Sequence, residues 1–344
     1  MAGEEREGEA AAERSPPKVG GSNRDDGGAK ARVGVIGTGM LGSAVAARLA
    51  KKMGACSVSV YNRTAQKTST AAVAGAAVLD SPAAVAESSD VILIIVRDAD
   101  AVREVSFGRQ RGTGGKIEER DGIASGCRGG QIVADMSTIG PADSREITAG
   151  YERLGIAKID APVMGGPDAA AAGSLIAMIS GNRDAFEKCR GVLDLFSERT
   201  FFLGTRAGTA NSVKLAMNMQ IAMLALSLAE GITLVGRSGV DPAIFLDVLN
   251  STYFSTGMSR RKAYNMIDKS QKPTFTLANL RKDIEIMAGT ADSLGLDLPM
   301  ITRAGEVYEE ALGQGHGGLD YTGIIRHIEE RGLRDGGRLH GSQK

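Results

Sequence analysis

The stretch "RVGVIGTGMLGSAVAARLAKKM", residues 32–53, places three glycines between an apolar run and an alanine-rich pattern of helical period. When such glycines follow a strand and open a helix, the first permits a tight turn, the second lets a pyrophosphate approach the backbone, and the third packs helix against strand. The phosphates then lie at the helix N-terminus, where free N–H groups and the helix dipole favour negative charge. A glycine-rich turn without a ligand is the alternative. The strand and helix context favours a dinucleotide site made by Gly37, Thr38, Gly39, Met40, Leu41 and Gly42.

The second expected strand, residues 57–61, indicates which dinucleotide binds. About twenty residues after the glycines, an NAD site usually places Asp or Glu against the ribose 2′-OH. This chain instead reads Asn62, Arg63 and Thr64, with no carboxylate. Asparagine and threonine can hydrogen-bond, and a guanidinium can pair with a 2′-phosphate. The sequence therefore predicts NADP(H) as the preferred cofactor, with NAD(H) as the second choice and a plain surface arginine as the alternative interpretation.

The hydrophobic pattern around this stretch predicts the fold class. Apolar runs at residues 33–36, 57–61, 91–96 and 132–135 alternate with helical patterns at 41–52, 65–74, 99–105 and 141–153. Such alternation is typical of a parallel sheet with crossover helices. After about Gly204 only helices are expected, at residues 209–237, 241–249, 256–266, 277–294, 301–312 and 321–330. We therefore expect an α/β, Rossmann-type doubly wound domain over residues 31–206, followed by an all-α domain over 207–330.

Composition limits the function classes. The 344 residues include 41 basic and 41 acidic side chains, so the whole-chain field favours neither nucleic acid nor an anionic membrane. The three cysteines lack zinc-ligand spacing, which predicts no metal site and fits a reducing, cytoplasmic compartment. The apolar segment at residues 215–229 is short for a membrane span and predicts a buried helix. Residues 1–30 and 331–344 are expected to be tails, the first of them disordered, and residues 108–130 a glycine-rich surface loop.

Two further clusters carry candidate chemistry. Gly165 and Gly166 follow an expected strand end, where consecutive glycines leave backbone N–H groups open to a substrate carboxylate, although a simple turn explains them equally well. Asn211, Lys214 and Asn218 lie along one stripe of an otherwise apolar helix. A lysine in such surroundings must be paired or must face a cleft. An ordinary solvated lysine is the alternative.

Together these residues resemble the β-hydroxyacid dehydrogenase family. The resemblance rests on "GVIGTGMLGSAVAARLAK", "DAPVMGGPDAAAAGSL", "GTANSVKLAMN" and "LRKDIEI", which occur in this order, together with "DMST" and "NRT". It extends from about residue 32 to residue 330, nearly the whole chain apart from the two tails.

The resemblance implies roles for particular residues. Lys214 corresponds to the catalytic lysine, and Asn218 to the asparagine that orients the substrate. Met164, Gly165 and Gly166, with Asn211, correspond to the substrate-binding segment. The implied cofactor contacts are Ile95, Val96, Arg97, Thr138 and Lys282. Three features depart from the family: Met164 replaces a serine, Arg97 replaces a proline, and the loop at residues 108–130 is longer than usual.

The implied activity is hydride transfer between nicotinamide and a small 3-hydroxy acid, or the corresponding semialdehyde or oxo acid, with Lys214 as general acid and base. Three alternatives stay open: a 6-phosphogluconate dehydrogenase, an NADPH-dependent imine reductase, and a non-catalytic dinucleotide-binding protein. Lys214 and Asn218 argue against the last two, and the sequence after "KLAMN" argues against the first. Because the helix at residues 209–237 is apolar on almost every face, we expect a homodimer or homotetramer.

Overall fold

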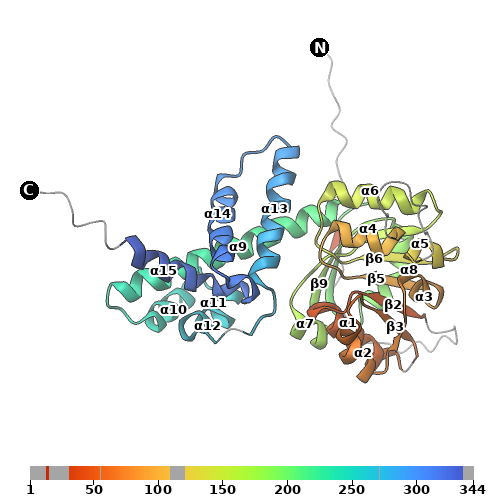
Figure 1. Ribbon diagram of the computed structural model, residues 1–344, viewed down its shortest axis with the longest axis horizontal. Coiled ribbons are helices and arrows are strands. Elements are labelled where there is room, and N and C mark those ends of the chain that lie inside the picture. The colour runs from red at the N-terminus through yellow and green to blue at the C-terminus, as the bar shows by residue number, and fades with distance from the viewer. Residues whose placement is uncertain (1–12, 15–30, 55, 109–120, 271, 336–344) are drawn as a thin grey trace, which may run out of the picture. The chain divides into compact units, whose positions relative to one another are not determined.

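The computed structural model describes residues 13–14, 31–54, 56–108, 121–270 and 272–335, and these form two compact units, Met1–Lys214 and Leu215–Lys344 (Figure 1). The predicted tail at residues 1–30 lies outside the described residues except for β1 (Glu13–Arg14). Most of the predicted loop, residues 109–120, also lies outside them. The final helix, α15 (Ile324–Asp335), continues five residues into the stretch expected to be a C-terminal tail.

The first unit is built on a sheet whose parallel part confirms the predicted fold class. Its described strands follow the order β1-β10-β9-β7-β6-β5-β2-β3-β4, in which β9 is Leu175–Gly181 and β10 is Ser197–Phe202. All neighbours from β7 to β4 are parallel, whereas β7 pairs with β9 in the antiparallel sense. The parallel strands are β2 (Val33–Ile36), β3 (Val58–Tyr61), β4 (Ala77–Val78), β5 (Val91–Ile94), β6 (Ile132–Asp135) and β7 (Ala157–Asp160).

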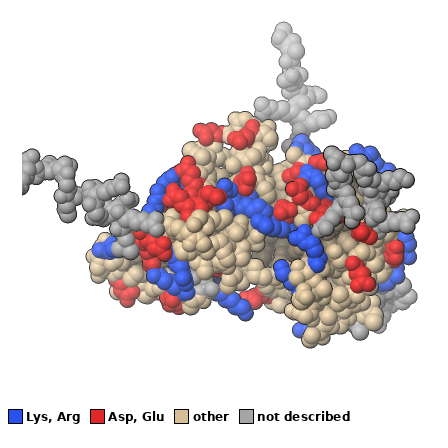
Figure 2. Space-filling model, in the orientation of Figure 1, with Lys and Arg blue, Asp and Glu red and all other residues tan. Residues whose placement is uncertain are grey.

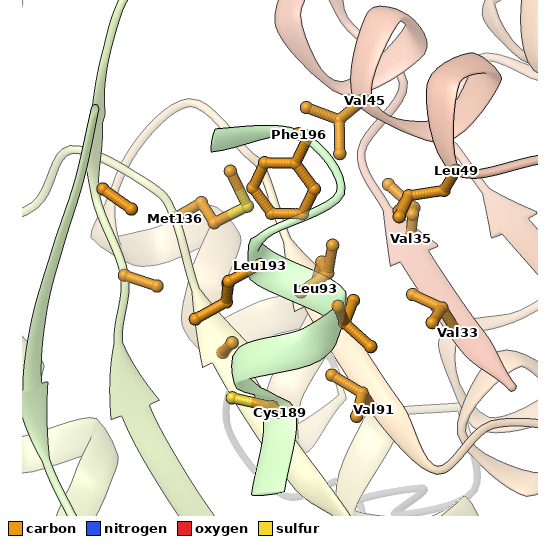
Figure 3. Packing of buried hydrophobic residues seen from close by; sticks show 14 of the residues in the cluster. Val33, Val35, Val45, Leu49, Val91, Leu93, Met136, Cys189, Leu193 and Phe196 are labelled. Atoms are coloured by element: carbon orange, nitrogen blue, oxygen red, sulfur yellow. The ribbon is translucent and has the colours of Figure 1, made fainter. Parts of the chain in front are cut away.

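Helices cover both faces of this sheet, which explains why the central strands are apolar on consecutive residues. On one face, α1 (Met40–Met53), α8 (Arg183–Leu193) and the turn after α8 pack on β2 and β5 through side chains that include Leu49, Leu193 and Phe196 (Figure 3). On the other face lie α3 (Pro82–Glu87), α4 (Ala99–Phe107), α5 (Ile123–Gly126) and α6 (Pro141–Glu152). A short 3-10 turn, Ala65–Thr68, and α2 (Ser69–Val73) follow β3.

The segment between residues 157 and 202 contains several elements, of which the sequence pattern indicated only a strand that ends before Gly165. They are β7, β8 (Val163–Met164), α7 (Pro167–Ala172), β9 (Leu175–Gly181), α8 and β10 (Ser197–Phe202). In β7 the buried polar residues Lys158 and Asp160 interrupt the apolar run, and in β10 the exposed Glu198 and Arg199 do so. Polar residues in short strands remove the periodicity on which such predictions depend.

The second unit is all-α, as predicted. Besides α15 and the 3-10 turns His316–Gly318 and Tyr321–Gly323, its described helices are α9 (Thr209–Arg237), which begins in the first unit, α10 (Pro242–Asn250), α11 (Gly257–Arg261), α12 (Ala263–Asp268), α13 (Leu277–Ser293) and α14 (Pro299–Gly313). The single helix expected at residues 256–266 is two helices, because the backbone leaves helical geometry at Lys262. The Lys262 ammonium pairs there with Asp320, at 2.9 Å from Oδ2.

Helix α9 is long and apolar enough to cross a membrane if only length and composition are considered, with a mean hydropathy of 1.6 over its most apolar window. The core helix of a soluble protein passes the same test. Leu215, Ala222 and Leu226 of α9 belong to the hydrophobic core of the second unit, and the Tyr308 hydroxyl donates to the Ala222 carbonyl at 3.2 Å. These contacts place one face of α9 in the core of the second unit, but only 33% of its most apolar window is buried, so the helix is less buried than the sequence predicted. Basic and acidic side chains both occur on the visible face of each unit (Figure 2).

Candidate active site

The glycine turn between β2 and α1 has the geometry that its spacing predicts. Gly37 has φ +97°, and a Cβ there would lie 2.2 Å from the Ile95 carbonyl oxygen. A Cβ at Gly42 would lie 1.9 Å from the Gly37 carbonyl oxygen, so only glycine lets α1 approach the turn this closely. A Cβ at Gly39 would meet no heavy atom within 4 Å. The first and third glycines are therefore required by the fold, whereas the second leaves open space beside the backbone.

A cavity of about 730 Å³ opens beside this turn. It lies at the carboxyl ends of β2, β3 and β5, where the strand order reverses around β2, the usual ligand position in a doubly wound sheet. Its described lining consists of Ile36, Gly37, Gly39, Tyr61, Asn62, Arg63, Thr64, Lys67, Pro82, Ile95, Val96, Arg97, Ala101, Glu104, Val105, Gly108 and Asp121.

The residues of this cavity fit a dinucleotide. No side chain caps α1 at Gly39, so the N–H groups of the first helical turn are not used by a cap. Beside them, the Thr38 hydroxyl oxygen is buried and has no hydrogen-bond partner among the described residues. Helix N–H groups next to an open glycine would hold a pyrophosphate. The backbone of Gly39, Met40 and Leu41 would provide this contact.

The loop after β3 holds the turn and presents a cation. The Asn62 Oδ1 atom accepts from the Thr38 N–H at 3.0 Å, and its Nδ2 donates to the Thr64 carbonyl at 2.9 Å. Asn62 thus ties the glycine turn to this loop, a role that sequence reasoning did not assign. The Arg63 side chain is 75% exposed, with Nη1 3.8 Å from Glu104 Oε2.

The remaining predicted cofactor residues are distributed as follows. Ile95, Val96 and Arg97 line the cavity, whereas Thr138 is not among its described lining. Ser137, next to Thr138, accepts from the Val96 N–H at 3.1 Å, which joins the loops after β5 and β6. Lys282 lies on α13 in the second unit. Lys67, Glu104 and Asp121 line the cavity without having been predicted.

Lys214 and Met164 meet within the first unit. The Lys214 ammonium lies on α9 and donates to the Met164 Sδ atom at 3.3 Å. Met164 ends β8, and Gly165 follows with φ +119°, where a Cβ would lie 2.7 Å from a methyl carbon of Leu175. Gly166 then caps the short helix α7. Asn211, one turn before Lys214, is buried, and its Oδ1 atom has no hydrogen-bond partner among the described residues.

A buried charge network fixes the start of α9. Asp160 Oδ2 accepts from the Gly208 N–H at 2.6 Å, and Asp160 Oδ1 accepts from the Lys158 ammonium at 2.5 Å. Ser180 donates to the same carboxylate at 2.9 Å and accepts from the Ala210 N–H at 3.0 Å. Burial alone would raise the pKa of Asp160, but the Lys158 charge and the Gly208 N–H hold it below its usual value. The ionised network anchors the helical turn that precedes Lys214.

In the second unit, Asn218 is joined to the "KD" motif. The Asn218 Nδ2 atom donates to Asp283 Oδ2 at 2.6 Å, and both side chains are buried. The Lys282 ammonium lies 2.7 Å from Asp283 Oδ1. The Asn218 Oδ1 atom has no hydrogen-bond partner among the described residues. Asp283 therefore fixes the Asn218 amide, and it was not among the predicted site residues.

The fold and the cavity define a dinucleotide-binding protein with a doubly wound sheet, and comparison with known proteins gives the family. Residues 32–204 match the family model of the NAD binding domain of 6-phosphogluconate dehydrogenase. Residues 208–328 match that of the NAD-binding domain of NADP-dependent 3-hydroxyisobutyrate dehydrogenase. The chain belongs to the β-hydroxyacid dehydrogenase family, as its motifs predicted.

Named relatives cover most of the chain. Glyoxylate/succinic semialdehyde reductase 2, chloroplastic, of Arabidopsis thaliana is 28% identical over 88% of this chain and 81% of its own length. Cytokine-like nuclear factor N-PAC of Danio rerio is 29% identical over 86% of this chain, which spans only 61% of that protein. The crystal structure of a 3-hydroxyisobutyrate dehydrogenase from Salmonella typhimurium is 26% identical, with a TM-score of 0.75 over 86% of this chain and 99% of its own.

Family membership determines the general chemistry. The cofactor is a nicotinamide dinucleotide, and the reaction class is NAD(P)-dependent oxidation and reduction at the CH–OH group of hydroxy acids or the corresponding carbonyl compounds.

Proposed function

We propose that the protein transfers a hydride between NADP(H) and a small 3-hydroxy acid, or the corresponding semialdehyde or oxo acid, with Lys214 as the general acid and base. The observation that carries this proposal is the position of the Lys214 ammonium, 3.3 Å from Met164, on a helix that begins at the Asp160 network. The name of the Arabidopsis reductase supports a semialdehyde or glyoxylate as the carbonyl substrate.

The protein's own residues would control the proton. When bound, the nicotinamide supplies or accepts the hydride. Lys214 would take the hydroxyl proton in oxidation and return it to the carbonyl oxygen in reduction. Met164 is an uncharged, weak acceptor, so its contact does not neutralise the ammonium. Asn218, held by Asp283, would hydrogen-bond the reacting oxygen.

The substrate side of the site would bind a small carboxylate through Gly165, Gly166 and Asn211. Met164 lacks the hydroxyl that the family's serine provides, so we propose that the substrate differs from 3-hydroxyisobutyrate in the group nearest this residue. A spectrophotometric screen tests this idea, with NADP⁺ and NADPH against serine, 3-hydroxyisobutyrate, 3-hydroxypropionate, glycerate, glyoxylate and succinic semialdehyde. Activity on none of them would contradict the proposed substrate class.

Retention of Lys214 argues against the two other functions considered. Imine reductases generally lack this lysine, and a non-catalytic dinucleotide-binding protein has no use for it. Asn218, on the next turn of α9, forms a buried pair with Asp283 of α13, a second polar feature that a purely structural helix does not need.

Arg63→Ala is expected to raise the KM for NADP(H) at least about tenfold, with little change for NAD(H), because a charge-assisted pair with the 2′-phosphate is lost. Initial-rate kinetics with both cofactors measures this effect. Equal activity of the unmodified protein with NADP(H) and NAD(H) would contradict the proposed preference.

We also propose a cytoplasmic location for the protein. The second unit would mediate its self-association. Large apolar side chains are exposed on it: Leu234 on α9, Ile244 and Val248 one turn apart on α10, and the adjacent Tyr253 and Phe254. Tyr253 is 89% exposed. Exposed apolar side chains of this size on neighbouring segments are typical of an interface.

Light scattering at micromolar concentration is expected to give two or four times the 35.8 kDa mass of the chain. Ile244→Glu should shift the protein towards the monomer, because the charge would be buried in the interface. Val73→Glu, at an exposed apolar residue of the first unit, is the control and should leave the mass unchanged. A monomer at all concentrations would refute the proposal.

A further inference from the structure

We infer that Glu104 limits the preference for NADP(H), because its carboxylate competes with the cofactor's 2′-phosphate for Arg63. This inference rests on the proposed function, in which Arg63 holds that phosphate. Glu104 lies on α4, in the part of the helix that lines the cavity beside Arg63. Its Oε2 atom is 3.8 Å from Arg63 Nη1.

The charges around the cavity are mixed. Its described lining includes three cations, Arg63, Lys67 and Arg97, and two carboxylates, Glu104 and Asp121. A cavity adapted only to a 2′-phosphate would need no carboxylate beside its guanidinium. The Glu104 side chain is 34% exposed, whereas the Arg63 side chain is 75% exposed. Solvent and salt therefore screen the Glu104 charge less than the Arg63 charge.

The carboxylate acts on the two cofactors differently. A 2′-phosphate monoester carries a charge of about −1.5 to −2 at neutral pH. To pair with Arg63 it must displace Glu104 or share the guanidinium with it, and it is repelled by the same carboxylate. The 2′-OH of NAD(H) is neutral and meets neither cost. Glu104 therefore weakens the binding of the phosphorylated cofactor alone.

The test is Glu104→Gln in the full-length protein, which keeps the shape of the side chain and removes its charge. Dissociation constants for NADP⁺ and NAD⁺ are measured by calorimetry at low and high salt. We expect NADP⁺ to bind about two- to fivefold more tightly at low salt, in line with a partly exposed ion pair, and NAD⁺ to be unchanged. The gain should shrink at high salt. Asp100→Asn is the matched control, because Asp100 lies on the same helix outside the described cavity lining and should change neither constant.

A double-variant cycle separates this inference from the proposed function. In the Arg63→Ala background, Glu104→Gln should improve NADP⁺ binding clearly less than in the unmodified protein, since there is no guanidinium left to compete for. If Arg63→Ala leaves NADP⁺ binding intact, the proposed cofactor preference fails. If Arg63→Ala weakens NADP⁺ binding but Glu104→Gln leaves it unchanged or weakens it too, or improves it equally in both backgrounds, the competition inferred for Glu104 is overturned and the proposed function stands.

Discussion

Lys214→Ala is expected to lower kcat by about 10²–10⁴-fold, the usual loss when a general acid or base is removed. The affinity for NADPH should change little, because the phosphates would be held by the turn between Gly37 and Gly42 rather than by α9. Stopped-flow turnover on the best substrate of the screen and fluorescence titration with NADPH measure the two quantities separately.

Lys214→Arg is the control that separates proton transfer from charge. A guanidinium keeps the positive charge but cannot release a proton at working pH, so arginine should not restore turnover. Lys214→Met adds a neutral variant of similar length, which should be as inactive as Lys214→Ala. Near-normal turnover in the alanine and arginine variants would show that Lys214 is not the proton-transfer group, and the imine reductase and binding-protein functions would regain support.

The parts of the fold that could be predicted are those in which one physical requirement determines the residue type. Strand β2 and helix α9 have the predicted bounds, because both are predominantly apolar and glycines lie close to their ends. Gly37 and Gly42 were predicted from spacing, since any Cβ there would collide with backbone atoms. Arg63 lines the cavity, as its position directly after the second strand of the dinucleotide-binding motif predicted. The prediction depended on this spacing from the glycines and not on the residue being an arginine.

The parts that could not be predicted depend on partners distant in sequence. Nothing in the sequence around Lys158 predicts that it is buried. Only the fold shows that its ammonium pairs with Asp160, whose other carboxylate oxygen accepts from the Gly208 N–H, so that the buried charges are compensated. Asp283 was assigned no role from the sequence, and only the structure joins it to Asn218, 65 residues earlier. Glu104 is an ordinary helical glutamate in the sequence, and its proximity to Arg63 comes from the way α4 follows β5.

The two glycines that behave differently in the turn allow folding to be separated from cofactor binding. Gly42→Ala would place a methyl group 1.9 Å from the Gly37 carbonyl oxygen, a backbone atom that cannot move without shifting α1 or the turn. We expect a loss of about 1–3 kcal/mol in unfolding free energy, typical of overpacking, together with weaker NADPH binding. Urea denaturation and NADPH titration on the same sample measure both.

Gly39→Ala should have the opposite pattern, and it tests the second glycine directly. The backbone of Gly39 has φ −66°, which alanine adopts without strain, and its methyl group would meet no heavy atom of the protein within 4 Å. Unfolding free energy should therefore stay within about 0.5 kcal/mol of the unmodified protein. NADPH affinity should nevertheless fall at least about tenfold, since the methyl group would occupy the space through which the pyrophosphate approaches the backbone N–H groups. Unchanged affinity in a stable Gly39→Ala protein would mean that the phosphates do not approach the turn at this residue, and the open space beside Gly39 would need another explanation.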